Sequence, residues 1–480
     1  MNSVMRRGAA RLAAVLLACG PAVAGVMAAA GPAAADGAGM NQDRQNRGGV
    51  SATLGRVTAG GGAIVHDPKK TGPALAGLFE MKVDGGGMLQ TYCVDILTNT
   101  VDGARYRETG WSESSLHDNK DAGRIRWILQ HSYPQINDLA ALAKDSGADS
   151  LDANAAAAGT QVAIWRYSDH VKVDAQDPRA QKLADWLYDS AKDTAEPGAS
   201  LSLTPSAVSG KSGRRLGPVT VRTDAGTIGL TPSADAAAKG VKIVDKDGKP
   251  ATATTNGGEI WFDVPSGAPA GSASVKATAA TKVPVGRAFI GDHIKTQTLI
   301  LAGSSESTVT ATAGVTWAQK GAIPAVTAKK DCARGGVEIT ADNQGDQPYT
   351  FELDGKKHTV RPGGTETVFV KVAEDAGYRF TITGPNGFAR TFSGILDCKT
   401  AETGSTGGTG GVHHLSARPS PAAGGTGGGS VTGGPLAATG GSTATPMIAG
   451  LAIALIVVGG GAVFLLRRKE ETGPGTGPGL

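Results

Sequence analysis

The 480-residue sequence has few aromatic residues, few charged residues and very few cysteines. Aromatic residues make up 5% and charged residues 19% of the chain, whereas glycine alone contributes 71 residues. A large enzyme core needs more bulky side chains, so the composition favours several small modules joined by flexible linkers. The net charge of +4 is too small to indicate a nucleic-acid partner, and no basic block with interleaved aromatics changes that expectation. We also expect no cofactor and no metal site.

The four cysteines divide into three groups. Cys19 lies in an N-terminal targeting segment, and Cys332 and Cys398 bracket one β-rich segment, where they are expected to pair in an oxidising compartment. Cys93 is then left without a thiol partner. A buried free thiol is one interpretation of Cys93, since cysteine packs well as a small apolar residue. A different covalent fate is the other, and both remain open at this point.

Export is predicted by the first 35 residues. Three arginines precede a short apolar run at residues 12–18, and an A-x-A cleavage site follows at residues 33–35. The run is too short for a membrane anchor, so residues 1–35 read as a secretory signal peptide. Residues 36–50 are polar and rich in glycine, and we expect them to form a flexible leader.

Residues 51–197 are expected to form an α+β domain. Alternating side chains predict a strand over residues 78–83, and a glycine-rich turn leads to a return strand over residues 88–97. Period-two geometry puts Cys93 and Asp95 on the same face of that second strand.

Three helices should follow within this domain. Isoleucine and leucine at i, i+3, i+4 spacing predict a helix over residues 125–134, which has to stop near its Tyr-Pro pair. A second helix over residues 155–167 carries Gln161 and Trp165 on its apolar stripe. An Asp-Pro pair at residues 177–178 opens the third helix.

Two mainly-β modules, both expected to be β-sandwiches, are predicted over residues 198–324 and 325–400. A Cys332–Cys398 disulfide would join the first strand of the second module to its last. Whether these modules also contain Lys–Asn or Lys–Asp isopeptide bonds is left open, because lysines cannot be paired from sequence. The expected strands are 217–221, 258–264, 273–277 and 296–302 in the first module, and 336–340, 349–353, 365–372 and 378–383 in the second.

The C-terminal part reads as a tether and a membrane span. Residues 401–435 are low-complexity and should be a disordered linker. Residues 447–466 are an apolar run long enough to cross a bilayer once as a transmembrane helix. The basic start of residues 467–480 predicts a cytoplasmic tail, so the bulk of the chain should face outward.

The pentapeptide that precedes this span resembles the sorting signal of Gram-positive surface proteins, in the L-A-x-T-G form read by class E sortases. Ala437 replaces the proline of the commonest form. The resemblance implies sortase cleavage between Thr439 and Gly440, with transfer to a peptidoglycan amine after a transient membrane attachment. A plain single-pass anchor is the alternative. The motif consists of Leu436, Ala437, Ala438, Thr439 and Gly440.

The sequence T-Q-x-A-I-W at residues 160–165, together with Y-C at residues 92–93, resembles the thioester domains of Gram-positive surface adhesins (the TQxA family). That resemblance implies an internal thioester between Cys93 and Gln161, formed by expelling ammonia from the glutamine amide. The cysteine thiolate is the nucleophile, and rigid placement of the two groups compensates for the poor reactivity of an amide.

Three further residues are candidates for supporting this site. Asp95 is a candidate for orientation or proton transfer, although a solvated carboxylate at a strand end is the plainer interpretation. Thr160 and Trp165 belong to the motif, and Trp165 is a candidate for excluding water.

The expected function is that of a secreted, cell-wall-anchored adhesin, not an enzyme. A surface amine of another molecule, most plausibly of a lysine, would attack the acyl carbon and release the cysteine. One alternative is a cysteine hydrolase or transpeptidase that pairs Cys93 with His117, His131 or His170. Another is a structural wall protein that binds without forming a covalent bond.

Overall fold

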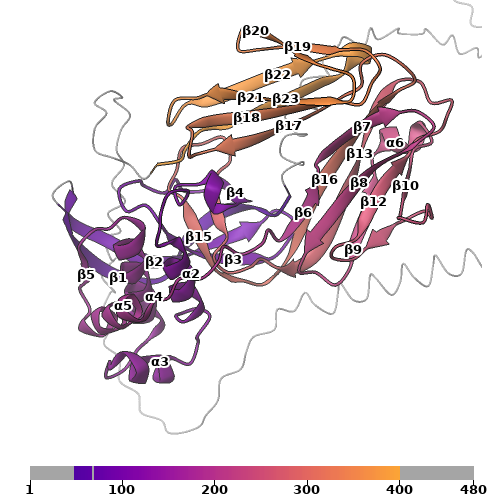
Figure 1. Ribbon diagram of the computed structural model, residues 1–480. Coiled ribbons are helices and arrows are strands. Elements are labelled where there is room, and N and C mark those ends of the chain that lie inside the picture. Colours follow the sequence, from indigo (N-terminus) through magenta and orange to yellow (C-terminus); the bar gives the residue numbers. More distant parts are fainter. Residues whose placement is uncertain (1–47, 68–69, 400–480) are drawn as a thin grey trace, which may run out of the picture. The chain divides into compact units, whose positions relative to one another are not determined.

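The computed structural model describes residues 48–67 and 70–399, which form three successive regions built on β-sheet (Figure 1). Within this part of the chain, no helix has the length and hydropathy needed to cross a membrane. Several predicted segments lie outside the described residues, namely the signal peptide (1–35), nearly all of the leader (36–50), the linker (401–435), the sorting motif (436–440), the apolar span (447–466) and the tail (467–480).

The first region is built on an antiparallel sheet of seven strands in the order β2-β3-β15-β14-β4-β1-β5. Because β1 also pairs with β2, six of the seven strands close into a ring. The strands are β1 (Ser51–Asp67), β2 (Lys70–Val83), β3 (Met88–Cys93), β4 (Arg105–Thr109), β5 (Val173–Ala175), β14 (Ala288–Gly291) and β15 (Leu299–Ser304).

Two strands of this sheet come from far downstream in the sequence. β14 pairs with β4, and β15 pairs with β3, with Leu299 opposite Cys93. We call β14, β15 and the loop between them the bridging hairpin. The prediction that residues 296–302 belong to the β-sandwich of residues 198–324 was therefore wrong. Residues 299–302 do lie in a strand, β15, but that strand belongs to the sheet of the first region, and residues 296–298 precede it.

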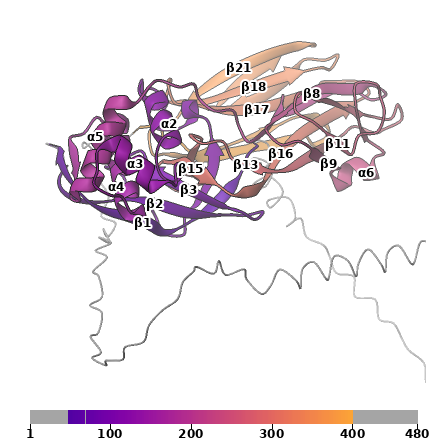
Figure 2. The ribbon, with the colours of Figure 1, turned by 90° about the horizontal axis from the view of Figure 1, so that it is seen from below.

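The helices of the first region cover one side of the sheet near β1 and β2 (Figures 1 and 2). All three predicted helices are present. Of the four helices described in this region, the second, third and fourth each begin with an aspartate N-cap, whose side chain accepts a hydrogen bond from a backbone N–H of the first turn. The helices are α2 (Ala122–Gln130), α3 (Leu139–Ser146), α4 (Ala153–Ser168) and α5 (Pro178–Ser190), with a 3-10 turn at Trp111–Glu113.

The second region is a sandwich of a four-stranded and a five-stranded sheet. Its longest hairpin, β13 with β16, has the bridging hairpin at its tip, so the two regions share one continuous stretch of chain. The elements are β6 (Leu201–Thr204), β7 (Ala207–Lys211), β8 (Arg215–Thr223), β9 (Ile228–Pro232), α6 (Ala234–Ala238), β10 (Lys242–Val244), β11 (Ala253–Thr254), β12 (Glu259–Asp263), β13 (Gly271–Lys282) and β16 (Glu306–Ala318).

The third region has its own aromatic core and a disulfide. The predicted Cys332–Cys398 bond is present, and it joins the end of β17 to the residues that follow β23. Tyr349 and Phe351 stack in the core, with ring centroids 5.4 Å apart. The strands are β17 (Pro324–Asp331), β18 (Gly336–Asn343), β19 (Tyr349–Leu353), β20 (Lys356–Val360), β21 (Gly364–Lys371), β22 (Gly377–Thr383) and β23 (Ala389–Ile395), with a 3-10 turn at Pro385–Gly387.

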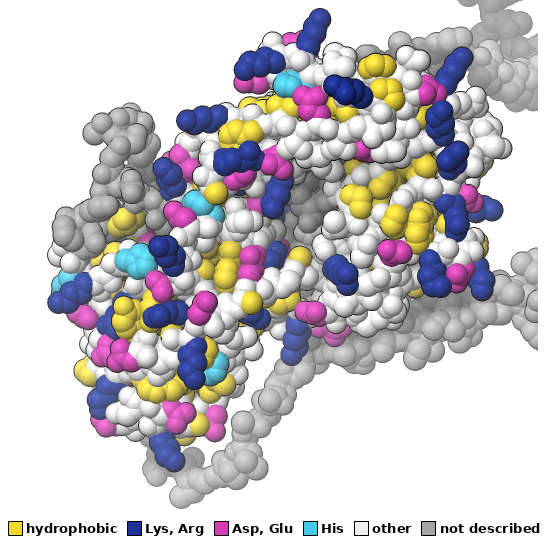
Figure 3. Space-filling view, in the orientation of Figure 1, with side chains coloured by type: hydrophobic (Ala, Val, Ile, Leu, Met, Phe, Trp, Pro, Cys, Tyr) yellow, Lys and Arg dark blue, Asp and Glu magenta, His cyan; other side chains and the backbone are white. Residues whose placement is uncertain are grey.

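Charged side chains of both signs are interspersed over the face shown in Figure 3. Lysine and arginine alternate with aspartate and glutamate over all three regions on that face. This distribution agrees with the small net charge of the whole chain.

Candidate functional site

Cys93 and Gln161 are in direct contact, although 68 positions separate them in the sequence. The Cys93 N–H donates to Gln161 Oε1 at 2.9 Å, and Gln161 Nε2 donates to the Cys93 carbonyl at 2.8 Å. Both residues are buried, with exposed fractions of 4% for Cys93 and 0% for Gln161. The structure therefore brings the predicted pair together and fixes the plane of the glutamine amide against the cysteine backbone.

Gln161 takes the place of a missing strand partner. β2 pairs with β3 only as far as Phe79 opposite Thr91, so no strand of the described chain lies on the β2 side of Cys93. A buried backbone N–H and carbonyl without partners would cost free energy. The side-chain amide of Gln161 bonds to both of these groups, as a backbone peptide of a next strand would.

Small residues let α4 pack closely against α5 and β1. A Cβ atom on Gly159 would lie 2.5 Å from the Ala180 carbonyl on α5, so only glycine fits there. A Cβ atom on Gly61 of β1 would lie 3.3 Å from the Cβ of Ala158. The prediction of a single apolar stripe on α4 was too narrow, because nearly the whole circumference of the helix from residue 155 onward is buried. Gln161 is thus held on a rigid, enclosed helix.

Tyr92 directly precedes Cys93, and Thr160 directly precedes Gln161. These two preceding residues are also in contact. The Tyr92 hydroxyl donates to the Tyr133 carbonyl at 2.8 Å, and the Thr160 hydroxyl is a hydrogen-bonding neighbour of that phenol. Thr160 Oγ1 donates to the Ala156 carbonyl at 2.8 Å. Burial raises the pKa of the Tyr92 phenol above its ordinary value, so it remains a neutral donor. This second contact fixes the register of α4 against β3.

Two carboxylates surround the loop that leaves Cys93. β3 ends at Cys93 instead of continuing to residue 97, so Asp95 lies in a turn and not on a strand face. Asp95 is 3% exposed, and its Oδ1 accepts from the Leu97 N–H at 3.1 Å. Asp169, which the sequence did not single out, accepts from the Ile96 N–H at 3.1 Å.

The environment of Cys93 disfavours the thiolate. Burial raises the pKa of the Cys93 thiol well above its ordinary value, and the nearby carboxylates of Asp95 and Asp169 raise it further. A sulfur in this site is therefore a poor leaving group unless a proton reaches it, which favours retention of an acyl group on Cys93.

Residues 90–193 match the protein family described as "Thioester domain", and this span includes both Cys93 and Gln161. The chain contains a thioester domain. Residues 324–395 match a second family, described as "Bacterial phospholipase C, C-terminal domain". No curated protein matches the sequence.

The solved structures that resemble the chain include two thioester-related proteins. The Bacillus anthracis TIE protein is 15% identical, with 74% of this chain and 81% of that chain covered and a TM-score of 0.26. The thioester domain of the Enterococcus faecium TIE86 protein is 21% identical, with 56% of this chain and 97% of that chain covered and a TM-score of 0.26. At these TM-scores the likenesses carry no argument about this chain.

Trp165 lies one helical turn after Gln161 on the same side of α4 of the thioester domain. It is 3% exposed, and its Nε1 is buried without a hydrogen-bond partner among the described residues. Thr91, two positions before Cys93 on β3, has a buried hydroxyl in the same condition. The predicted role of Trp165 in excluding water fits its burial, and nothing in its contacts gives it a chemical role.

Two of the three histidines considered as bases, His117 and His131, bond elsewhere. His117 Nδ1 lies 3.2 Å from the Ser114 carbonyl, and His131 Nδ1 lies 2.8 Å from the Trp127 carbonyl, with its ring stacked on that indole. His170 follows α4, with a φ of 52°. None of the contacts found for these histidines in the described chain reaches Cys93.

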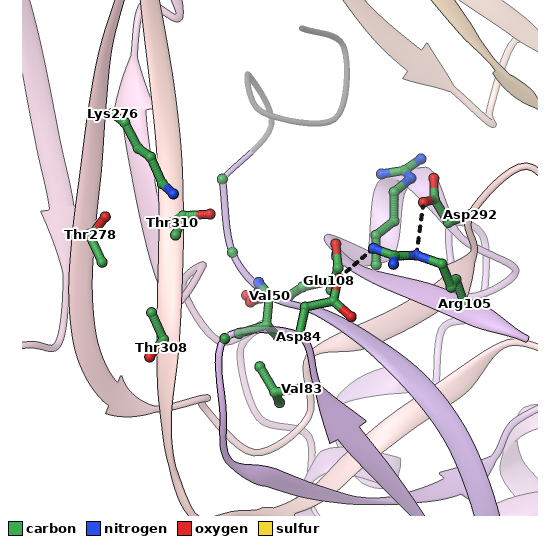
Figure 4. A pocket seen from close by; sticks show the side chains of 15 residues that line it. Val50, Val83, Asp84, Arg105, Glu108, Lys276, Thr278, Asp292, Thr308 and Thr310 are labelled. Carbon is green, nitrogen blue, oxygen red and sulfur yellow. Dashed lines mark hydrogen bonds and ion pairs between the residues drawn. The ribbon is translucent and has the colours of Figure 1, made fainter. Parts of the chain in front are cut away.

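A pocket of about 430 Å³ lies between the thioester domain and the second region. Arg105 reaches toward Asp84 and Asp292 there, and Lys276 lies across the pocket on β13 (Figure 4). Neither Cys93 nor Gln161 lines this pocket. The candidate site is therefore a closed contact between β3 and α4, separate from this cavity.

One group in the described residues has the spacing of metal ligands. Oxygen atoms of Glu374, Asp375 and Asp397 lie within 4.8 Å of one another. Glu374 Oε1 already accepts from the Cys398 N–H at 2.6 Å, and Lys295 pairs with Asp375 at 2.5 Å. These acidic groups thus have ordinary protein partners, and we assign no metal to them.

Proposed function

We propose that the protein forms an internal thioester between Cys93 Sγ and Gln161 Cδ and uses it to attach covalently to an amine of another molecule. The two-point contact between the Cys93 backbone and the Gln161 amide carries this proposal. The match to the thioester domain family over the same two residues supports it.

The observed contact suits the formation of the bond. Attack of Sγ on Cδ places negative charge on Oε1, the atom that already accepts the Cys93 N–H at 2.9 Å. A fixed donor at a developing oxyanion lowers the barrier to acyl transfer. The new Sγ–Cδ bond replaces the Cδ–Nε2 bond, and Nε2 leaves as ammonia with the proton that the thiol loses. Holding both groups in place contributes about 7–11 kcal/mol in favourable model systems.

The same atoms suit the transfer step. After ammonia leaves, the Cys93 carbonyl, which had accepted from Nε2 at 2.8 Å, is available to an incoming amine N–H. The amine nitrogen then bonds to Cδ of Gln161 and the Cδ–Sγ bond breaks. A proton from the amine goes to Sγ, so the products are an amide and a free Cys93 thiol. By this route the attacking amine occupies the position from which ammonia departed.

The burial of the pair fits a stored, single-use bond. Water that reached a thioester would hydrolyse it, and enclosed sites exclude such side reactions. Cys93 and Gln161 are nearly inaccessible, so the acyl group would persist until a partner opens the site. Because each event consumes the bond, we propose a covalent attachment protein and not an enzyme with turnover.

The proposed setting is the outside of a Gram-positive cell. The signal peptide, the L-A-x-T-G motif with its apolar span, and a tether support secretion, sortase cleavage and anchoring to peptidoglycan. A lysine amine on a protein surface is the proposed target. Together these features describe an adhesin displayed on the cell wall.

Two other functions have less support. A cysteine hydrolase or transpeptidase needs a base beside its nucleophile, and the contacts of His117 and His131 lead away from Cys93. A non-covalent wall protein needs no contact between Cys93 and Gln161, yet they share two hydrogen bonds. If the protein were a non-covalent wall protein, the Cys93→Ala variant would adhere as well as the wild type.

Methylamine tests the transfer step on the full chain. We expect one methylamine to be added to the side chain of Gln161, with the release of one thiol that reagents detect at Cys93. Cys93→Ala is the matched control, since it removes only the buried sulfur and leaves both backbone bonds to Gln161 in place. Absence of an adduct on a folded wild-type protein, or equal labelling of the alanine variant, overturns the proposal.

A further inference from the structure

We infer that Gln297, on the bridging hairpin, is a positioning residue of the thioester site. This inference rests on the proposed function and adds a residue from another region of the chain to it. The match to the thioester domain family ends at residue 193, so it does not include Gln297.

The hairpin extends the ladder along β3 past the reactive cysteine. Leu299 of β15 is opposite Cys93, and the next bond runs from the Val94 N–H to the Thr298 carbonyl at 3.2 Å. One step further the backbone ladder stops, and the Gln297 side chain replaces it. Its Nε2 donates to the carbonyl of Asp95. The first residues after Cys93 are thus paired without a gap.

Gln297 is itself fixed from two other directions. Its backbone N–H donates to the Asn99 carbonyl at 3.2 Å, and its carbonyl accepts from the Tyr106 hydroxyl at 3.1 Å. The Tyr106 hydroxyl also lies 2.8 Å from Thr296 Oγ1. The side chain of Gln297 is 5% exposed, so its amide has little freedom to bond to water instead. A buried glutamine whose backbone and side chain are both hydrogen-bonded holds the loop after Cys93 rigidly.

The reactive cysteine is therefore held from both sides. Gln161 on α4 bonds to the Cys93 backbone on one edge of β3, and the bridging hairpin bonds to Val94 and Asp95 on the other. Loss of the Gln297 donor would remove this bond from the Asp95 carbonyl, which also accepts from the Thr98 N–H at 3.4 Å. Relaxation of that loop would move Sγ relative to Cδ of Gln161.

Small displacements of reacting atoms have large kinetic effects. A misplacement of about 1 Å can cost about a hundredfold in rate. A purely structural role for Gln297 would lower stability without changing the chemistry of the folded protein. A positioning role predicts a defect in thioester formation or reactivity that persists in the folded fraction.

The test uses Gln297→Met in the full chain, which keeps the volume of the side chain and removes its donor. The matched control is Gln135→Met, because Gln135 Nε2 also donates to a carbonyl of the bridging hairpin, that of Ala302 at 2.8 Å, away from Cys93. Measurements are the fraction with the thioester by intact mass, the rate with methylamine and the melting temperature. For Gln297→Met, but not for Gln135→Met, we expect the thioester fraction or the rate with methylamine to fall about tenfold or more.

Gln297→Glu provides a second readout should the methionine variant fail to fold. A protonated glutamic acid can donate to the Asp95 carbonyl, whereas its carboxylate cannot and would repel it. The rate with methylamine, divided by the wild-type rate at the same pH, should therefore rise as the pH falls. A ratio that does not change with pH overturns the inference.

The outcomes separate the inference from the proposed function. If the wild type has no thioester, the proposed function fails, and the Gln297 variants are not needed to show it. Suppose instead that the wild type has the thioester, and that Gln297→Met equals both the wild type and Gln135→Met in thioester fraction and in rate with methylamine. Then only the positioning role is overturned.

Discussion

Arg287 Nε donates to Glu108 Oε1 at 2.9 Å, and both side chains are buried although 179 positions separate them. Glu108 lies on β4, and Arg287 immediately precedes β14 of the bridging hairpin. The same Glu108 carboxylate accepts from the Ser200 N–H at 2.9 Å and from the Val50 N–H at 3.2 Å. One buried carboxylate thus joins the start of the thioester domain, its β4, the link to the second region and the hairpin that returns from it.

Replacing Arg287 by methionine should strongly destabilise the first two regions. It leaves the Glu108 carboxylate buried without its counter-ion, and breaking a buried pair in this way typically costs about 3–5 kcal/mol. Chemical denaturation at neutral pH measures the free energy of unfolding. The double variant Arg287→Met with Glu108→Gln removes both charges and should recover a large part of the loss. Equal stability of the wild type and the single variant would contradict the account of this ion pair.

A chain that ends at residue 197 should not fold. It contains all of the residues matched by the thioester domain family, but it lacks β14 and β15, so β3 and β4 each lose one of their two neighbours in the sheet. Residues 48–323, which include the bridging hairpin, are the matched comparison. Circular dichroism and amide dispersion in NMR spectra distinguish the two. A folded 48–197 fragment that forms the thioester would show that the hairpin is dispensable.

Removing the disulfide should affect the third region alone. Cys332 and Cys398 are separated by 66 positions, and the chain-entropy model gives about 4 kcal/mol for a loop of that length. Replacing both cysteines by serine should therefore lower the unfolding free energy of β17 to β23 by up to about this amount, as hydrogen exchange reports it. The reaction with methylamine should be unchanged. Loss of that reaction would show that the third region is coupled to the thioester site.

Asp169→Asn should make the freed Cys93 thiol ionise at lower pH. Burial, then Asp95 and then Asp169 raise the pKa of this thiol, so removing one negative charge lowers that pKa. After methylamine has opened the thioester, the rate of alkylation by iodoacetamide follows the thiolate fraction. Its pH profile should shift toward lower pH in Asp169→Asn. Asp149→Asn, at an exposed site paired with Lys182, is the control. Identical profiles in both variants would contradict the assignment.

Local sequence signals predicted the reactive pair and most of the secondary structure. The T-Q-x-A motif and the Y-C pair led to Cys93 and Gln161, which the structure places in contact. The Asp-Pro pair at residues 177–178 marked the start of α5, and short runs of residues typical of strands marked strands of the third region. Each of these signals spans only a few neighbouring residues, and the pairing of Cys93 with Gln161 followed from the resemblance to the TQxA family.

The sequence did not indicate which distant strands and side chains come together in the fold. The run at residues 299–302 is buried on both faces, so its pattern predicts a strand without indicating which sheet it joins. β1 was missed because its glycine run, residues 60–62, is typical of a turn, yet here it lets α4 pack closely. Asp169 and Gln297 carry no motif, and their place beside Cys93 follows only from the packing of α4 and the bridging hairpin.

The most direct test of the central claim is the intact mass of the secreted wild-type protein under acidic, denaturing conditions, before any amine is added. The account predicts a mass lower than that of the processed, disulfide-bonded sequence by one ammonia, with fragments that locate the cross-link between the peptides of Cys93 and Gln161. Gln161→Ala should show its full calculated mass and one free thiol. A wild-type protein that is folded, has its full mass and offers Cys93 as a free thiol would contradict the account.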